Sequence, residues 1–209
     1  MVFKTKIGYY TGTTDGYTDD EAQQFIVDGC YDVYRKFKAI KGFDEQQRFG
    51  VFSAGDTSGN ALNIDEINEI FYVQRNGIPA TQVSVNQVHK YTDTGSIHYA
   101  SINDPIFYIQ EDNLYVKPVS SPSAGAVYYL YLPQYAVTSY TSASSSIDKF
   151  PAEYYDYVLV YAAIKLLEQL YHNYIEDDED SELAQLMAGR MDRLKLQYNE
   201  MFGGMNNDA

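Results

Sequence analysis

A capped amphipathic helix is encoded by residues 18–40, TDDEAQQFIVDGCYDVYRKFKAI. Thr18 and Glu21 form a capping-box pattern, in which each side chain accepts a hydrogen bond from the backbone amide of the other residue. Apolar residues then recur every three or four positions, which places them on one helix face that must be buried. These residues are Ala22, Phe25, Ile26, Cys30, Val33, Tyr34 and Phe37.

The same spacing returns in two stretches near the C-terminal end. Pro151 suits the first turn of the first helix, and Gly203-Gly204 ends the second. The link is so short that the two helices must form an antiparallel hairpin. Gly189 costs about 1 kcal/mol relative to alanine inside the second helix, so we expect it at a close contact between helices. The apolar faces are Tyr155, Leu159, Ala162, Leu166, Leu170 and Tyr174 in the first helix, and Leu183, Met187, Met191, Leu194, Tyr198 and Met201 in the second.

Between these helical stretches the apolar residues alternate, which predicts strands. Ile67–Arg75 and Ile78–Val88 flank Asn76-Gly77, a strong hairpin signal because both central turn residues need positive φ. The other predicted strands are Ile106–Ile109 and Leu114–Val116, joined through Glu111–Asn113, and Ala126–Tyr135. The middle of the chain is therefore an antiparallel β module.

This order predicts an α+β fold. The N-terminal helix and the C-terminal hairpin can bury their apolar faces together only if they share one bundle, so the β module is an insertion into that bundle. The predicted boundaries are an N-terminal arm at 1–17, the bundle at 18–41 and 147–204, the β module at 62–136, and a loosely ordered Ser/Thr-rich connector at 137–146.

Composition limits the function. The chain has 209 residues, a formal charge of -14 and a pI near 4.4, a balance that disfavours direct binding to nucleic acid and also suits simple solubility. Its 22 tyrosines, without any tryptophan, suit either an ordinary half-buried sheet or a wet protein interface. The single Cys30 excludes an intrachain disulfide, and neither a secretory signal nor a membrane span is apparent. We expect synthesis in a cytoplasm.

Few residues form a pattern typical of a catalytic or metal-binding site. His89, His98 and His172 lack the spacing of a zinc site. Asp56–Asn60 resembles a calcium loop weakly, but Ile67 occupies the position of the bidentate glutamate. The acidic run Glu176–Asp180 fits a solvated turn between helices. We therefore expect no catalytic site, metal or cofactor, so the chain is not predicted to be an enzyme.

Several motifs resemble those of tailed-bacteriophage head-to-tail adaptor proteins, also called connector or neck proteins. The clearest are Asp104–Ile109 with Leu114–Pro118, which look like the adaptor hairpin, and Phe150–Asp156 continuing to Tyr161–Ala163, which looks like the start of the first C-terminal helix. Arg75–Gly77 and Gly95–Ile97 follow in the family's order. The resemblance covers Thr18 to Phe202.

The resemblance implies a structural subunit of the virion neck. About twelve copies would form a ring between the portal protein and the tail, nozzle or tail-terminator proteins. DNA would only pass through the channel, and no membrane would be involved. The helical bundle would meet the portal and the β module would reach tail parts. The alternative is a Tyr-rich carbohydrate-binding or adhesin module, although such modules usually contain tryptophan and rarely carry a long helical hairpin.

Two groups of residues are candidates for specific roles in such a ring. Adaptable apolar side chains near the C-terminal end are the predicted portal interface: Tyr198, Met201, Phe202 and Met205. Acidic side chains would line the channel and repel DNA so that it slides without sticking: Asp19, Asp20, Glu21, Glu176, Asp177 and Asp178.

Overall fold

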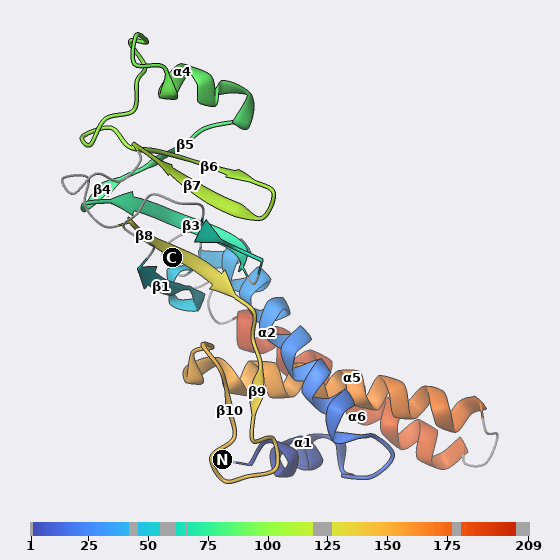
Figure 1. Ribbon diagram of the computed structural model, residues 1–209. Coiled ribbons are helices and arrows are strands. Elements are labelled where there is room, and N and C mark those ends of the chain that lie inside the picture. The colour runs from blue at the N-terminus through green and yellow to red at the C-terminus, as the bar shows by residue number, and fades with distance from the viewer. Residues whose placement is uncertain are drawn as a thin grey trace. The chain divides into compact units, whose positions relative to one another are not determined.

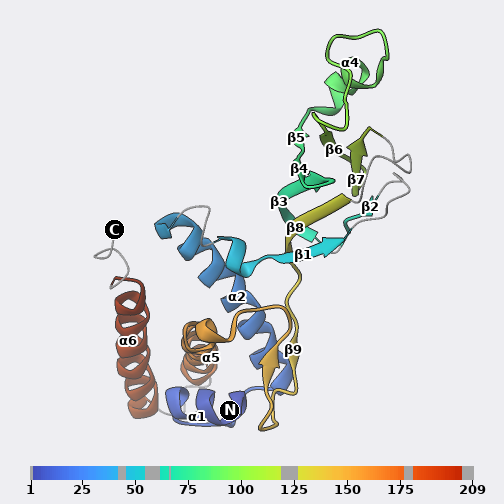
Figure 2. The same ribbon diagram turned by 90° about the vertical axis from the view of Figure 1, so that its left-hand side faces the viewer.

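The computed structural model describes residues 2–41, 46–54, 62–65, 67–118, 127–176 and 181–203. The chain divides into two compact units, each with its own core (Figures 1 and 2). The helical unit comprises Met1–Phe49 and Tyr135–Ala209, and the β unit comprises Gly50–Gln134. The predicted α+β class is confirmed, since helices dominate the first unit and two sheets form the second.

The helical unit is built around α5 (Tyr155–Glu176), which contacts α1 (Phe3–Thr11), α2 (Asp19–Lys41) and α6 (Ser181–Gly203). A 3-10 turn, η3 (Ala152–Tyr154), precedes α5, and another, η1 (Gln47–Phe49), follows α2. Of the described side chains of α5, nine are buried, and they lie on more than one face of the helix. A helix buried on several sides organises the core, because more than one neighbour must cover it.

The capping box of α2 is present. The Thr18 amide donates to Glu21 Oε2 at 2.7 Å, and the Glu21 amide donates to Thr18 Oγ1 at 3.2 Å. Six of the seven predicted stripe residues are buried against the rest of the unit, and Phe25 is partly exposed. Local sequence therefore predicts both where α2 begins and which face it buries.

The close helix contact is at Gly29, and the prediction for Gly189 is wrong. A Cβ added to Gly29 in α2 would lie 3.0 Å from Tyr161 Cδ1 and 3.1 Å from the Val158 carbonyl oxygen, both in α5. A Cβ added to Gly189 would meet nothing within 4 Å. The cause is the helix face: Gly189 lies opposite the buried residues of α6, which include Met187, Leu194 and Tyr198.

The predicted arm at 1–17 is wrong where α1 forms. A nine-residue helix containing Gly8 and two threonines has weak intrinsic stability. Phe3 and Ile7 are fully buried, so tertiary packing stabilises this helix where propensity does not. That contribution is invisible in the local pattern.

The predicted loose connector at 137–146 is also wrong. β9 (Val137–Thr138) and β10 (Ser146–Ile147) pair as an antiparallel hairpin within the helical unit. Tyr140 and Ser145 are buried, and Ser145 Oγ donates to backbone carbonyls including that of Tyr140 at 3.0 Å. Short polar side chains here satisfy the backbone of a tight loop.

The β unit contains two sheets, with strand orders β1-β8-β3-β4 and β2-β7-β6-β5. Asn76 and Gly77 both have positive φ, as do Glu111 and Asp112 in the second hairpin, so both predicted turns form. Side chains of both sheets share one core that includes Val73, Phe107, Leu114, Val116 and Val127. The strands are β1 (Val51–Ala54), β2 (Leu62–Asn63), β3 (Ile67–Arg75), β4 (Ile78–Pro79), β5 (Thr81–Gln82), β6 (Ile106–Gln110), β7 (Asn113–Lys117) and β8 (Val127–Pro133).

Two details of the β prediction are wrong. The strand predicted to run to Val88 ends early, and its last residues form the 3-10 turn η2 (Val85–Gln87) and α4 (Val88–Thr92). Proline at position 79 cannot donate to a ladder, so β4 stops there and the chain crosses to the other sheet. There β5 pairs with β6 in parallel, whereas the other pairings are antiparallel.

Alanine substitutions at the two glycines should have opposite effects. Gly29→Ala should destabilise the chain, because an overpacking cost of about 1–3 kcal/mol exceeds the helix-propensity gain of about 1 kcal/mol. Gly189→Ala should raise the Tm by about 2–4 °C, because only the propensity gain applies. Thermal unfolding of the purified variants measures both, and a rise for Gly29→Ala would contradict the proposed close contact.

Candidate functional site

The C-terminal half of α6 brings two of the predicted portal-contact residues together. Tyr198 and Phe202 lie with ring centroids 5.1 Å apart, and the Phe202 ring is 5.6 Å from that of Phe37 in α2. The two side chains are only 5% and 6% exposed. They therefore belong to the core of the helical unit, where they hold the end of α6 against α2 and α5.

A polar group completes this contact between α6 and α2. The Tyr198 hydroxyl donates to Asp32 Oδ2 at 2.6 Å. Lys36 Nζ lies 3.4 Å from the same carboxylate oxygen and 3.9 Å from the centroid of the Tyr198 ring. Burial and the hydrogen bond to Asp32 raise the pKa of Tyr198 above its usual value, because ionising the hydroxyl would break that bond and place a second negative charge beside the carboxylate.

The other predicted portal residues are placed differently. Met201 is partly exposed, and its carbonyl accepts a hydrogen bond from Tyr157 at 3.4 Å. Met205 lies outside the described residues. The sequence pattern identified a real apolar cluster, but an inward-facing heptad position and an exposed anchor look the same in sequence.

The predicted channel acids are only partly described. At the start of α2, Asp19 pairs with Lys4 at 2.8 Å, Glu21 serves the capping box, and Asp20 is exposed. The backbone amide of Thr18 lowers the pKa of Glu21, so the cap stays ionised to a lower pH than an ordinary glutamate would. Glu176 ends α5 without a described side chain, and Asp177 and Asp178 lie outside the described residues.

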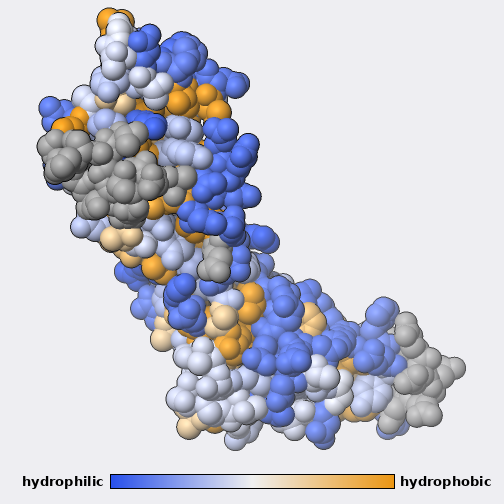
Figure 3. Space-filling model, viewed as in Figure 1, coloured by the Kyte–Doolittle hydropathy of each residue, from blue (hydrophilic) through white to orange (hydrophobic). Residues whose placement is uncertain are grey.

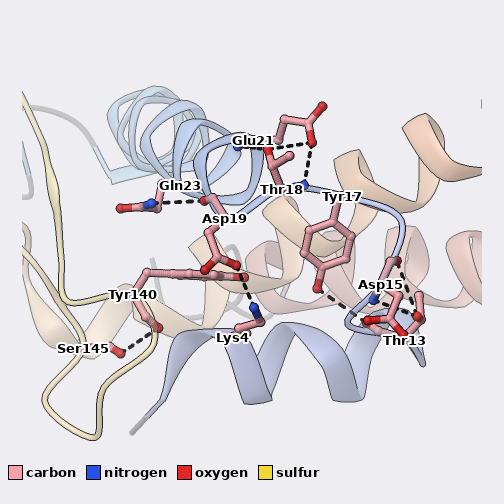
Figure 4. A network of polar contacts seen from close by, with 10 residues as sticks. All are labelled: Lys4, Thr13, Asp15, Tyr17, Thr18, Asp19, Glu21, Gln23, Tyr140 and Ser145. Carbon is pink, nitrogen blue, oxygen red and sulfur yellow. Dashed lines mark hydrogen bonds and ion pairs between the residues drawn. The ribbon is translucent and has the colours of Figure 1, made fainter.

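Sequence reasoning missed the polar network that fixes α1 to its neighbours. Figure 4 shows Lys4 of α1 pointing toward Asp19 of α2, next to Tyr140 of the loop between β9 and β10. The Lys4 amide donates to the Tyr140 carbonyl at 3.3 Å, and the Phe3 amide donates to Ser145 Oγ at 3.3 Å. Tyr140 joins this network through its backbone carbonyl, and burial raises the pKa of its hydroxyl above the usual value. No local pattern in residues 1–17 indicates these long-range partners.

The face of α1 that points away from the core is exposed, and a shallow cavity lies on each side of it. Tyr9 is 80% exposed and lines two shallow cavities of about 640 and 350 Å³. Thr5 and Lys6 contribute to the smaller cavity, whose wall is almost wholly apolar. On α6, Leu186 and Leu196 are also exposed. These two helix faces are the candidate interaction surfaces of the helical unit.

The β unit exposes single hydrophobic side chains. Ile97, in the segment after α4, is 95% exposed, and Figure 3 shows hydrophobic surface in the region of α4. Phe52 and Tyr128 stack on each other with centroids 5.6 Å apart. His89 and His98 are exposed, and Asp56–Asn60 lies outside the described residues. Within the ranges that the structure describes, no group of three or more His, Cys, Asp or Glu could hold a metal ion.

The hydrogen bond between Tyr198 and Asp32 can be tested by removing one atom. Tyr198→Phe should destabilise the chain by about 1.5–3 kcal/mol, the range for hydrogen bonds to charged groups. Chemical denaturation measures this loss, with the exposed Tyr9→Phe as the control, expected within about 0.5 kcal/mol of wild type. Equal stability of Tyr198→Phe and wild type would show that this contact does not fix α6.

Comparison with known proteins identifies the family. Among the helices of the described residues, none is long and apolar enough to cross a membrane. No curated protein matches the chain significantly. The sequence model of the SU10 adaptor protein family, a family of phage head-to-tail adaptors, matches residues 3–207. Because this match covers nearly all of its 209 residues, the chain belongs to the SU10 adaptor protein family.

Proposed function

We propose that the chain is a structural subunit of the phage neck, a ring-forming head-to-tail adaptor that docks under the portal. The family match over residues 3–207 carries this proposal. In the ring, about twelve copies would surround the DNA channel and provide the platform for tail attachment. The proposed partners are the portal protein, the tail, nozzle or tail-terminator proteins, and further copies of the chain. The proposed location is the virion neck.

The division into two units supports a role between two partners. Each unit buries its own apolar core, so each offers a separate surface to a partner. We assign the helical unit to the portal and the β unit to tail parts.

The portal contact is proposed at the end of α6. Because Tyr198 and Phe202 are buried, they act by fixing the last turns of α6 in place. The partly exposed Met201 and the following Met205 then remain as the adaptable apolar side chains for the portal. This division of roles separates the stability of the chain from its affinity for the portal.

The acidity of the chain supports passage of DNA without binding. A charge of -14 per copy multiplies in a ring, and acids facing the channel would prevent the counterion release that makes DNA bind tightly. The exposed Asp20 and the acidic run that begins at Glu176 are the proposed lining residues.

A carbohydrate-binding role has less support. A sugar-binding platform offers free aromatic faces, but the Phe52 and Tyr128 rings stack on each other with an interplanar angle of 10°. Tyr108 and Tyr115 stack in the same way, at 7°. These tyrosines therefore use a ring face for contacts with neighbours within the sheet, as the half-buried-sheet interpretation of the tyrosine content predicts.

The adaptor role predicts assembly on the portal. Purified chain mixed with portal rings of the same phage should sediment with them in many copies per ring, and negative-stain images should show an added layer on one face. A mutant portal lacking its tail-proximal surface is the control. Free chain that never co-sediments with intact portal rings would contradict the proposal.

Truncation tests the terminal contact. A chain ending at Gly203 keeps Tyr198 and Phe202, so its Tm should match that of wild type. Its affinity for portal rings should fall at least about tenfold if Met205 and its neighbours are contacts. A chain ending at Gln197 is the matched comparison, since it should unfold more easily as well. Unchanged affinity of the chain ending at Gly203 would place the portal contact elsewhere.

A further inference from the structure

The outer face of α6 carries a regular stripe of residues. Their positions advance by four, three, four, three and four, which keeps them on one side of the helix, opposite the buried seam. Leu186 is 61% exposed and Leu196 is 60% exposed, with Gly189 between them. The full stripe is Glu182, Leu186, Gly189, Arg193, Leu196 and Glu200.

Gly189 lowers the stability of α6 at its position. A glycine inside a helix is about 1 kcal/mol less favourable than alanine, and no atom lies within 4 Å of the Cβ that alanine would add. No contact of the described chain therefore offsets the cost. Arg193 Nε donates to the Gly189 carbonyl at 3.3 Å, so the arginine lies back along the helix. The result is a low point on the helix surface between two exposed leucines.

The outer face of α1 has a projecting side chain where the α6 stripe has a recess. Phe3, Ile7 and Thr11 are the buried side of this helix, which places Thr5 and Tyr9 on the outside. Tyr9 projects from that side between the two cavities. A projecting ring flanked by hollows is the arrangement that packs into the grooves of another helix.

The two faces match in length. The rise of 1.5 Å per residue puts Leu186 and Leu196 about 15 Å apart and makes the nine residues of α1 about 13.5 Å long. Tyr9 can therefore lie over Gly189 while Leu186 and Leu196 contact α1 on either side of it.

The two faces also differ in charge. The only charged residues of α1 are Lys4 and Lys6, which pair with acids of their own chain. Each ammonium group has three donors, so it can serve a second carboxylate as well. In the α6 stripe, Glu182 and Glu200 outnumber Arg193. Two copies at -14 each repel in general, so a contact is most favourable where lysines of one copy meet acids of the other.

We propose that the α6 stripe of one copy packs against the outer face of α1 in a neighbouring copy, with Tyr9 over Gly189. This contact rests on the proposed adaptor function, because it joins the copies side by side. The two faces differ, so the contact is head-to-tail and each copy can bind a neighbour on either side. Within one chain the two helices contact each other elsewhere, at the C-terminal end of α1, where Arg190 of α6 donates to the Thr11 carbonyl at 2.8 Å.

Cross-linking between two chains that each carry one added cysteine tests the pairing. Full-length Thr5→Cys and Arg193→Cys chains are mixed and treated with a short bismaleimide, both free at high concentration and on portal rings. Cys30 is fully buried and should not react. A Thr5→Cys plus Asn199→Cys mixture is the control, because Asn199 is exposed on α6 away from the stripe.

The mixed dimer should form in the first mixture and not in the control. Its absence both in solution and on portal rings, or equal yields from the two mixtures, would overturn the proposed contact. Portal binding without the cross-link would leave the adaptor role standing and remove this contact. A cross-link without portal binding would support this contact and contradict the adaptor role.

Gly189→Leu separates stability from assembly. In the free chain this substitution should raise the Tm by about 2–4 °C, since leucine is a good helix former and the site is open. On portal rings it should reduce the cross-link yield of the Thr5→Cys plus Arg193→Cys pair at least about fivefold. The reason is that the added side chain would occupy the place of Tyr9. Asn199→Leu is the control for added bulk. Unreduced yield with Gly189→Leu would show that the glycine is not at the contact.

Discussion

The approach of α2 to α5 at Gly29 is the contact on which the helical unit depends. Only a residue without a side chain lets the α2 backbone lie against Tyr161 and the Val158 carbonyl. This approach brings Phe37 of α2 to within ring contact of Tyr154, Tyr157 and Phe202. The aromatic cluster in turn fixes the end of α6 through Tyr198 and Asp32. A loss of packing at Gly29 would therefore also weaken the attachment of α6.

This arrangement determines which surfaces are left for partners. With α5 covered by α1, α2 and α6, the helical unit presents the outer faces of α1 and α6, where Tyr9, Leu186 and Leu196 are exposed. The network of Lys4, Asp19 and Tyr140 holds α1 in position, so its outer face is presented by a fixed helix. An assembly subunit benefits from such rigidity, because surfaces that are already ordered lose less entropy on binding.

Sequence reasoning succeeded where structure is local and failed where it depends on distant partners. The Thr18–Glu21 cap and the Asn76-Gly77 turn are encoded by adjacent residues, so they were predictable. The α1 helix depends on burial of Phe3 and Ile7 by segments more than a hundred residues away, which local propensity cannot reveal. Gly189 shows a third case: the sequence indicates its cost to the helix, but not that the residue faces away from the core. Similarly, Tyr198 and Phe202 were identified as a group, and only the structure shows that they face inward.

A reconstruction of the intact virion neck by electron cryomicroscopy tests the proposed assembly most directly. We expect a closed layer of this chain between portal and tail, with α6 of each copy against α1 of the next and the helical unit on the portal side. Density for the chain only in a peripheral position such as a tail fibre, or a layer in which the chain touches no portal subunit, would contradict it.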